Sequence, residues 1–280
     1  MDIVAKQYVR DAEQILTNTT YLEYFSYFKS VKQKHVAQLY EKAGSLFELN
    51  DDLLEDAGDN YMLSATYYIE VNLVMLSAIN HQRAGKCFQK VKNYTKSSVA
   101  YRMAIEQRPF DTNFVIKCSS SIAENHFALG NIAECVKWFE SCIIANVKID
   151  RDDLNFDFYD KLGIIYCTCL KRYAIGITVY DKLVELLRKR KDVSLPIYCF
   201  IAVLLRILAN NDDMEFAKKY MDSLDKSFLE SGYAEFLRNI FFYAGKDVAV
   251  LERFYTYYGE RVPGLDNVNV QELVRAVIAL

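Results

Sequence analysis

Residues 113 to 143 constrain the fold of this chain more than any other stretch, because they predict one αα-hairpin with a single apolar stripe on each helix. The turn is Gly130-Asn131, and apolar side chains flank it at helical spacing: Val115, Cys118, Ile122 and Leu129 before it, and Ile132, Val136, Phe139 and Ile143 after it. A pair of helices with one stripe each leaves apolar surface uncovered. The hairpin must therefore stack against similar hairpins.

A repeated phrase predicts where those other hairpins lie. The phrase has a small or apolar residue, then an aromatic ring, then a charge, and its clearest rings are Tyr101, Phe139, Tyr180 and Tyr220, separated by 38, 41 and 40 residues. A period of this size is typical of two-helix solenoid repeats and is longer than the roughly 34 residues of a strict tetratricopeptide repeat (TPR). Coincidence in a helical chain rich in aromatic residues is the alternative.

The expected fold class is therefore all-α. We expect a right-handed α-α solenoid of TPR-like helical hairpins over residues 1–230, followed by a C-terminal helical bundle or cap over 231–280 whose last helix covers 268–278. With only 3 prolines and 10 glycines in 280 residues, the composition suits helices joined by short turns.

Charge, cysteines and hydropathy limit where the protein acts. A formal net charge of −3 argues against charge-driven nucleic-acid binding. The 7 cysteines are scattered among apolar residues and are interpreted as reduced core cysteines. The N-terminal residues lack the plan of a signal peptide, and the longest uncharged apolar run, 195–205, is far shorter than the ~20 residues that cross a bilayer. We expect a cytoplasmic protein.

The sequence contains no motif that indicates catalysis. It lacks a Gly-rich phosphate loop and the HExxH, GxSxG and CxxC patterns. His35, His81 and His126 are far apart, and Cys167 and Cys169 would point in different directions on a helix. We expect no enzyme activity, no metal site and no cofactor.

An aromatic segment from Tyr21 to Lys29 is the first candidate binding feature. Its candidate membrane-attaching residues are Tyr21, Leu22, Tyr24, Phe25, Tyr27 and Phe28. Rings at the headgroup level, with Lys29, Lys32 and Lys34 beside them, would give modest and reversible membrane binding. Packing of the same rings under the first hairpin is an equally good interpretation.

Lysines on the first helices of the hairpins are the second candidate. Lys117 is expected to share a polar face with Asn113, Ser120, Ser121 and Glu124, and Lys90 closes the corresponding helix one repeat earlier. First helices of such repeats usually line the concave side, where extended partners bind. A solvated lysine face without a partner is the alternative.

At these residues the chain resembles the soluble NSF attachment protein (SNAP) family. The phrases that carry the resemblance are 117–124 (KCSSSIAE), 84–90 (AGKCFQK) followed by 103–106 (MAIE), and 21–28 followed by 36–47. The resemblance implies an adaptor that binds a SNARE four-helix bundle, recruits the hexameric AAA ATPase NSF, and works in several copies per SNARE complex although it is a monomer in isolation.

The resemblance also assigns residues to partners. Lys90 and Lys117 correspond to SNARE-binding positions, and Lys161 lies close to a third such position, which Phe158 occupies. Residues 21–29 correspond to the membrane-attaching loop. The ATPase-facing glutamates of the family fall on Phe241, Ala244 and Gly245, and the acidic tail is missing, so Glu272, Arg275 and Leu280 are the candidate ATPase contacts. The alternative function is a general TPR-like scaffold that binds peptide segments of another cytosolic complex.

Overall fold

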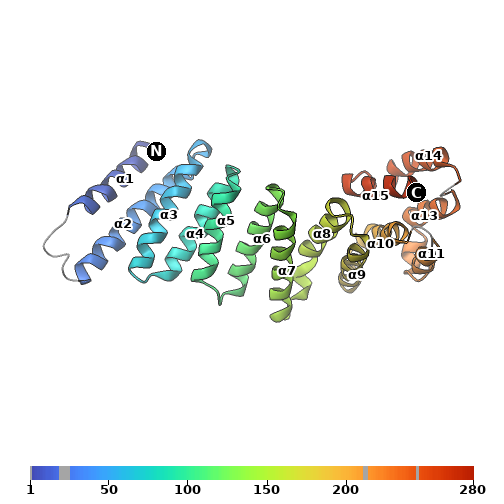
Figure 1. The fold of residues 1–280 in the computed structure, drawn as a ribbon, viewed down its shortest axis with the longest axis horizontal. Coiled ribbons are helices and arrows are strands. Elements are labelled where there is room, and N and C mark those ends of the chain that lie inside the picture. The colour runs from blue at the N-terminus through green and yellow to red at the C-terminus, as the bar shows by residue number, and fades with distance from the viewer. Residues whose placement is uncertain (1, 19–25, 211–213, 244–245) are drawn as a thin grey trace. The chain divides into compact units, whose positions relative to one another are not determined.

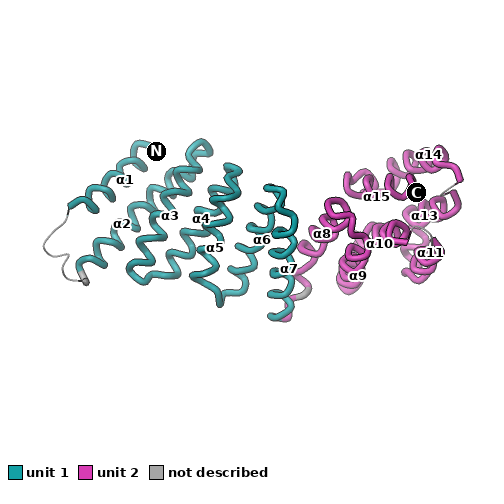
Figure 2. Tube along the Cα trace, in the orientation of Figure 1, with its two compact units in different colours: residues 1–149 teal, residues 150–280 magenta. Residues whose placement is uncertain are grey.

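The chain folds into two compact units of α-helices. The computed structural model describes residues 2–18, 26–210, 214–243 and 246–280. Unit 1 covers residues 1–149 and unit 2 covers residues 150–280 (Figure 2). The described residues contain helices and turns without a β-strand, and successive helices pack in antiparallel pairs, so the predicted all-α fold of TPR-like hairpins is confirmed. The predicted boundary at residue 230 stays a prediction.

In the described part of unit 1, seven helices form a row in which each helix packs on the next (Figure 1). Their bounds are α1 Asp2–Thr17, α2 Ser26–Phe47, α3 Leu54–Glu70, α4 Val74–Lys90, α5 Tyr94–Gln107, α6 Thr112–Ala128 and α7 Ile132–Lys148, with a short 3-10 helix, η2, at Asp51–Leu53.

Because successive helices are antiparallel, the connections of unit 1 gather at its two ends. Residues 28–31, 69–76, 108–112 and 147–149 lie at one end, which we call the Phe110 end (Figure 1). Residues 48–56, 90–94 and 129–132 lie at the other, the Asp51 end.

Aromatic rings stacked on helical glycines explain how the hairpins approach so closely. A Cβ atom on Gly44 would lie 3.1 Å from the Tyr61 ring, and one on Gly85 would lie 2.9 Å from the Tyr101 ring. In unit 2 the same relation joins Gly163 to the Tyr180 ring, at 2.7 Å. Each ring is buried. The absence of a side chain at these positions lets the aromatic anchors of the repeat enter the space between helices.

One turn geometry recurs between paired helices. At the α3–α4, α4–α5 and α6–α7 turns, an amide donates to a carbonyl five residues earlier, at 2.8 Å in each case: Leu73 N to Tyr68 O, Asn93 N to Phe88 O and Asn131 N to His126 O. The residue before each donor has a positive φ: Asn72, Lys92 and Gly130. This is the Schellman ending, which satisfies carbonyls at a helix C-terminus.

Unit 2 has shorter helices around one larger core. Its elements are η3 Asp152–Asn155, α8 Phe156–Ile164, the π-helical turn η4 Ile165–Cys169, α9 Tyr173–Arg190, α10 Leu195–Ala209, α11 Met214–Asp222, α12 Lys226–Leu229, α13 Gly232–Tyr243, α14 Val248–Gly259 and α15 Val268–Ile278. Helix α10 is buried from Cys199 to Leu208 and contacts α9, α11, α13 and α15. The predicted last helix, 268–278, is confirmed.

Two details differ from the sequence-based expectation. Leu129 was expected in the core, yet it is the C-cap of α6 and 43% exposed, because the helix ends before its stripe reaches that position. Cys167 and Cys169 were expected on an α-helix but lie in the π-helical turn, where Cys167 is buried and Cys169 is exposed. All seven cysteines are free, and six are buried.

Candidate functional site

The predicted SNARE-binding lysines of unit 1 project into solvent from α4 and α6. Lys90 is the last residue of α4, and Lys117 lies in the second turn of α6. Both are exposed. The Ser120 and Ser121 hydroxyls donate to the Lys117 carbonyl oxygen at 3.0 and 3.2 Å, so these serines are turned onto their own helix. Lys117 is therefore an exposed cation on this polar face, which also carries the exposed side chains of Asn113 and Glu124.

Contacts across helices place these lysines on one surface. Arg83 of α4 reaches Glu41 of α2, with 3.1 Å between Nη1 and Oε1, and Gln82 of α4 donates to the Cys118 sulfur of α6 at 3.6 Å. Helices α2, α4 and α6 thus lie side by side. We call their shared exposed surface the even-helix face, defined by the following residues: Gln38, Glu41, Lys42, Arg83, Lys86, Lys90 and Lys117.

Two carboxylates near this face, Glu41 and Glu48, already accept hydrogen bonds from other side chains of the protein. Glu41 accepts from Arg83 and from the Tyr68 hydroxyl, the latter at 2.7 Å. Glu48 accepts from the Tyr61 hydroxyl at 2.8 Å. Burial raises the pKa of the Tyr68 hydroxyl, and its hydrogen bond to Glu41 raises it further. These acids hold α3 and α4 against α2, so they counter the charge of Arg83 rather than that of the lysines.

Three lysines on the face keep their charge available. Lys86, Lys90 and Lys117 are exposed, and within the described ranges no carboxylate forms an ion pair with any of them. Burial raises the pKa of the neighbouring Cys87 thiol to about 12, although Lys90, Arg83 and Lys86 all act to lower it. Lys86 was not predicted. Its spacing of four residues from Lys90 on one helix was the signal that could have found it.

A cleft of about 810 Å³ extends this face toward α1. It is lined by residues of α1 to α4: Val4, Tyr8, Gln38, Glu41, Lys42, Ser45, Leu46, Tyr68 and Arg83. The Lys42 ammonium lies 5.7 Å from the centre of the Tyr8 ring. The cleft is mixed in polarity, with cations and hydroxyls beside aromatic surface. Such a lining suits a peptide-like partner better than a small apolar ligand.

Lys161 and the predicted ATPase contacts belong to unit 2. Lys161 is half-buried in α8. Glu272 and Arg275 are exposed on α15, whose opposite face, including Leu273 and Val277, enters the core. Both line a cleft of about 410 Å³ with Thr168, Lys171 and Tyr173, among others. Leu280 lies beyond the end of α15 and is 45% exposed.

The predicted membrane-attaching residues fall mostly outside what the structure describes. Tyr21, Leu22, Tyr24 and Phe25 lie outside the described residues, and the Tyr27 side chain is not described either. Phe28 is exposed in the first turn of α2, which begins at Ser26. The membrane-attaching assignment therefore stays a prediction.

The described residues show neither a metal cluster nor a membrane span. No three His, Cys, Asp or Glu side chains in this part of the chain gather as metal ligands would. None of the helices described is long and apolar enough to cross a membrane.

Comparisons with known proteins identify the family to which the chain belongs. The model of the soluble NSF attachment protein family, SNAP, matches residues 4–249. No curated protein matches the chain. Among solved structures, the apo form of RapI matches with a TM-score of 0.51 and 17% identity, over 89% of this chain and 75% of RapI. BtubC from P. vanneervenii matches with a TM-score of 0.48 and 11% identity, over 79% of this chain and 87% of BtubC. The likeness to RapI concerns the fold alone, whereas the family match covers most of the sequence, and the chain therefore belongs to the SNAP family.

Proposed function

We propose that this protein is a non-enzymatic adaptor that binds a SNARE four-helix bundle and recruits an NSF-type AAA ATPase, so that the ATPase can disassemble the bundle during vesicle transport. The observation that carries the proposal is the even-helix face, on which Lys86, Lys90 and Lys117 are exposed without an ion-pair partner in the described residues. An elongated partner with acidic stripes is complementary to that face.

The charges on this face favour orientation and speed of binding more than affinity. An exposed ion pair contributes only about 0–1 kcal/mol. Several weak pairs along one rigid row of helices nevertheless fix the register of a long partner and raise its association rate. Several copies of the adaptor around one bundle would add avidity. Lys161 of unit 2 belongs to the same proposed contact.

Two further contacts complete the proposal. Residues 21–29 hold the cytoplasmic adaptor at the membrane that carries the SNAREs, by reversible contact of their aromatic rings. The C-terminal residues Glu272, Arg275 and Leu280 face the ATPase. Glu272 and Arg275 support this assignment because their side chains are exposed, whereas Leu273 and Val277 on the opposite side of α15 are buried in the core.

Charge reversal on the even-helix face tests the proposal. The double variant Lys90→Glu/Lys117→Glu should lower binding to a purified SNARE bundle by roughly tenfold or more, because two attractions become repulsions. The matched control is Lys148→Glu/Lys218→Glu, which changes net charge equally at exposed lysines of α7 and α11 for which the described residues show no ion pair. The control should bind like wild type, and both variants should keep the wild-type far-UV circular dichroism.

The result that contradicts the proposal is equal binding by the two double variants. A SNARE bundle that binds but is not released by ATP and the ATPase would instead favour the general TPR-like scaffold. The mixed cleft of about 810 Å³ is the observation that favours that second function. In that case a cleft variant, Gln38→Ala/Lys42→Ala, should affect peptide capture more than Lys90→Glu/Lys117→Glu does.

A further inference from the structure

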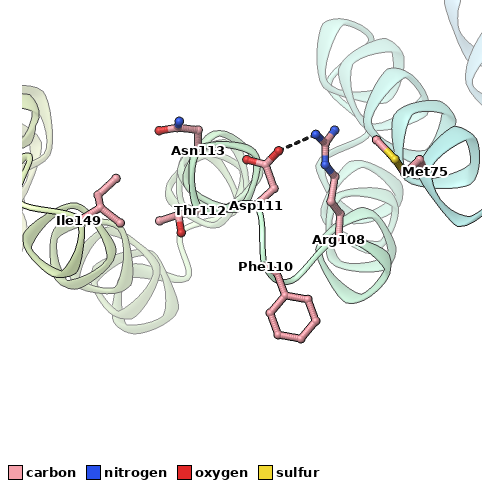
Figure 3. Close-up of a pocket in the computed structure, with 7 residues that line it drawn as sticks. All are labelled: Met75, Arg108, Phe110, Asp111, Thr112, Asn113 and Ile149. Carbon is pink, nitrogen blue, oxygen red and sulfur yellow. Dashed lines mark ion pairs between the residues drawn. The ribbon is translucent and has the colours of Figure 1, made fainter.

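Phe110 is the most exposed large apolar side chain among the described residues, at 97%. It lies in the loop Arg108–Asp111 between α5 and α6. In Figure 3 its ring points away from the six other labelled side chains and into open space. The Arg108 guanidinium forms an ion pair with Asp111 at 2.5 Å, which braces the loop behind the ring. The loop thus presents the ring on a fixed support.

Phe110 belongs to an apolar edge and is not an isolated ring. A hollow of about 580 Å³ lies beside its loop (Figure 3). The hollow is also lined by Met75 of α4, which is 60% exposed, and by Ile149, the C-cap of α7. Further exposed apolar side chains lie at the same end of unit 1. We define the apolar edge by Val31, Ile69, Met75, Phe110 and Val147. Single exposed apolar residues are ordinary, but a set gathered at one end of a helical row indicates a contact surface.

The edge borders the segment predicted to attach to the membrane. Phe28, in the first turn of α2, belongs to that segment, and Val31 of the edge lies in the second turn of the same helix. Antiparallel packing then brings the α3–α4 turn, the α5–α6 loop and the end of α7 to the same end (Figure 1). A surface made of separate loop tips around one open hollow suits a flat partner.

Charge distinguishes the two ends of unit 1. In the ranges that define the Phe110 end, Lys29, Arg108 and Lys148 outnumber Glu70 and Asp111, which gives a net charge of +1. In the ranges that define the Asp51 end, five acids outnumber Lys90 and Lys92, which gives a net charge of −3; the acids are Glu48, Asp51, Asp52, Glu55 and Asp56. An anionic surface would therefore favour the first end over the second.

We propose that the apolar edge is a second membrane contact, in which Phe110 and Met75 enter the boundary between headgroups and acyl chains of an anionic bilayer. The inference rests on the membrane contact that we propose for residues 21–29, and it adds a second membrane-binding site elsewhere on unit 1. Two weak contacts on one rigid unit reinforce each other, because the first holds the second close to the surface. They also fix the tilt of the helical row on the membrane.

The test measures partitioning of the full chain onto vesicles of phosphatidylcholine with about 30% phosphatidylserine, an anionic surface like that of a cytoplasmic leaflet. Phe110→Ser should lower the partition coefficient by about tenfold, because the apolar surface of one ring is lost from the boundary. Leu49→Ser is the matched control, since Leu49 is 69% exposed at the Asp51 end. It should partition like wild type. Both variants should melt like wild type, because neither side chain is packed.

A second measurement reports the position of the ring directly. Phe110→Trp should show a blue-shifted emission on vesicles and quenching by brominated lipids, after subtraction of the wild-type signal from Trp138. Leu49→Trp should show neither. Phe28→Ser should detach the protein by removing the first contact. If that variant detaches while Phe110→Trp emission and Phe110→Ser partitioning are both unchanged, the second contact is overturned.

Other occupants of the edge give different results. A concentration-dependent dimer that Phe110→Ser abolishes, with unchanged partitioning, would identify a second copy of the chain. Weaker SNARE binding by Phe110→Ser without vesicles, again with unchanged partitioning, would identify a protein partner. Either outcome overturns the membrane contact. Because the vesicle assay contains neither SNAREs nor the ATPase, failure of the adaptor function and failure of this contact are observed separately.

Discussion

Unit 1 and unit 2 bury their aromatic rings in different ways. In unit 1 the core is divided into small clusters between neighbouring helices, such as the one around Tyr61 and Phe88 and the one around Tyr101. In unit 2 a single cluster joins α9, α10, α11, α13, α14 and α15. The stability of a repeat array is the sum of the stabilities of its repeats and of the interfaces between adjacent repeats, whereas helices that share one core unfold together. We therefore expect local damage in unit 1 and cooperative loss in unit 2.

The same contrast holds for buried charge. Arg206 of unit 2 is 6% exposed, and its Nη2 atom lies 2.9 and 2.7 Å from the two Asp181 carboxylate oxygens. Its guanidinium also stacks on Tyr220, 3.4 Å from the ring centre. The corresponding pair in unit 1, Arg83 with Glu41, is partly exposed. Among the described residues, the Arg206 guanidinium is therefore a buried charge whose carboxylate partner, Asp181, is 41% exposed, whereas in the Arg83–Glu41 pair both side chains are partly exposed.

The largest expected effect comes from the centre of the unit 2 core. Phe236→Ala should cost about 4 kcal/mol of unfolding free energy, because the ring is fully buried and contacts Phe200, Tyr255 and Tyr258. The single tryptophan, Trp138, lies in unit 1. Urea unfolding should therefore show early loss of circular dichroism while Trp138 fluorescence keeps its midpoint.

The control for this variant is Phe242→Ala, on the same helix but exposed, which should shift neither signal. Equal shifts of both signals in Phe236→Ala would contradict the separation of the two units.

Removal of an anionic partner should have the next largest effect. Asp181→Ala leaves the Arg206 charge buried without its carboxylate, which should destabilise unit 2 by about 3 kcal/mol. Glu41→Ala leaves Arg83 partly in water and removes the acceptor of the Tyr68 hydroxyl, so it should cost about 1–2 kcal/mol in unit 1. Urea midpoints of the two variants measure the difference. Similar costs for the two substitutions would show that burial does not distinguish these pairs.

Local periodicity made much of unit 1 predictable from the sequence. The ring spacing from Tyr101 to Tyr180 located the hairpins, and the stripe of α6 left Lys117 on the exposed side. The turn at Asn72 was missed although its geometry matches that at Gly130, because it carries neither glycine nor proline. Asparagine takes a positive φ at helix ends less often than glycine, so Asn72 is a weak local signal, whereas the positive φ at Lys171 has no local signal in the sequence.

Long-range packing explains what the sequence did not reveal in unit 2. The uniformly apolar α10 was visible as a run, but its role at the centre of a separate core depends on α13 and α15, which follow much later in the chain. The π-helical turn at Ile165–Cys169 likewise has no sequence signal. For the candidate site, the sequence did not show which lysines lack a carboxylate partner. This depends on how Glu41 and Glu48 are engaged, and their hydrogen-bond donors lie on α3 and α4.

A glycine substitution measures the repeat interface of unit 1. Gly85→Ala should destabilise that unit by about 1–2 kcal/mol, because the new Cβ would lie 2.9 Å from the buried Tyr101 ring and a small gain in helix propensity only partly compensates. Trp138 packs against the same cluster, so its fluorescence midpoint reports the change. Gly259→Ala has open space at its Cβ and should be neutral or slightly stabilising. A neutral Gly85→Ala would show that the Tyr101 ring shifts freely.

The smallest expected effect is a difference in pH dependence between the units. All three histidines lie in unit 1. Burial lowers the pKa of His81, and it also lowers that of His126, where the Arg102 charge acts in the same direction. A group whose pKa is lower in the folded state binds its proton more readily when unfolded. Unit 1 should therefore lose stability as the pH falls from 7.5 to 5.5, by at most about 1.4 kcal/mol per pH unit for each proton.

Unit 2 should respond less to acid over this range. Burial raises the pKa of Asp160, so the folded state takes up that proton first, whereas the lowered pKa values of Glu185 and Asp192 destabilise the fold only at more acidic pH, where unfolded carboxylates take up protons. Trp138 fluorescence follows unit 1, and hydrogen exchange resolved by peptide follows both units at each pH. His81→Phe should reduce the acid sensitivity of unit 1, because it removes a buried group that the unfolded chain protonates. Equal acid sensitivity of the two units, unchanged by His81→Phe, would mean that the buried histidines do not set the pH dependence and that carboxylates common to both units do.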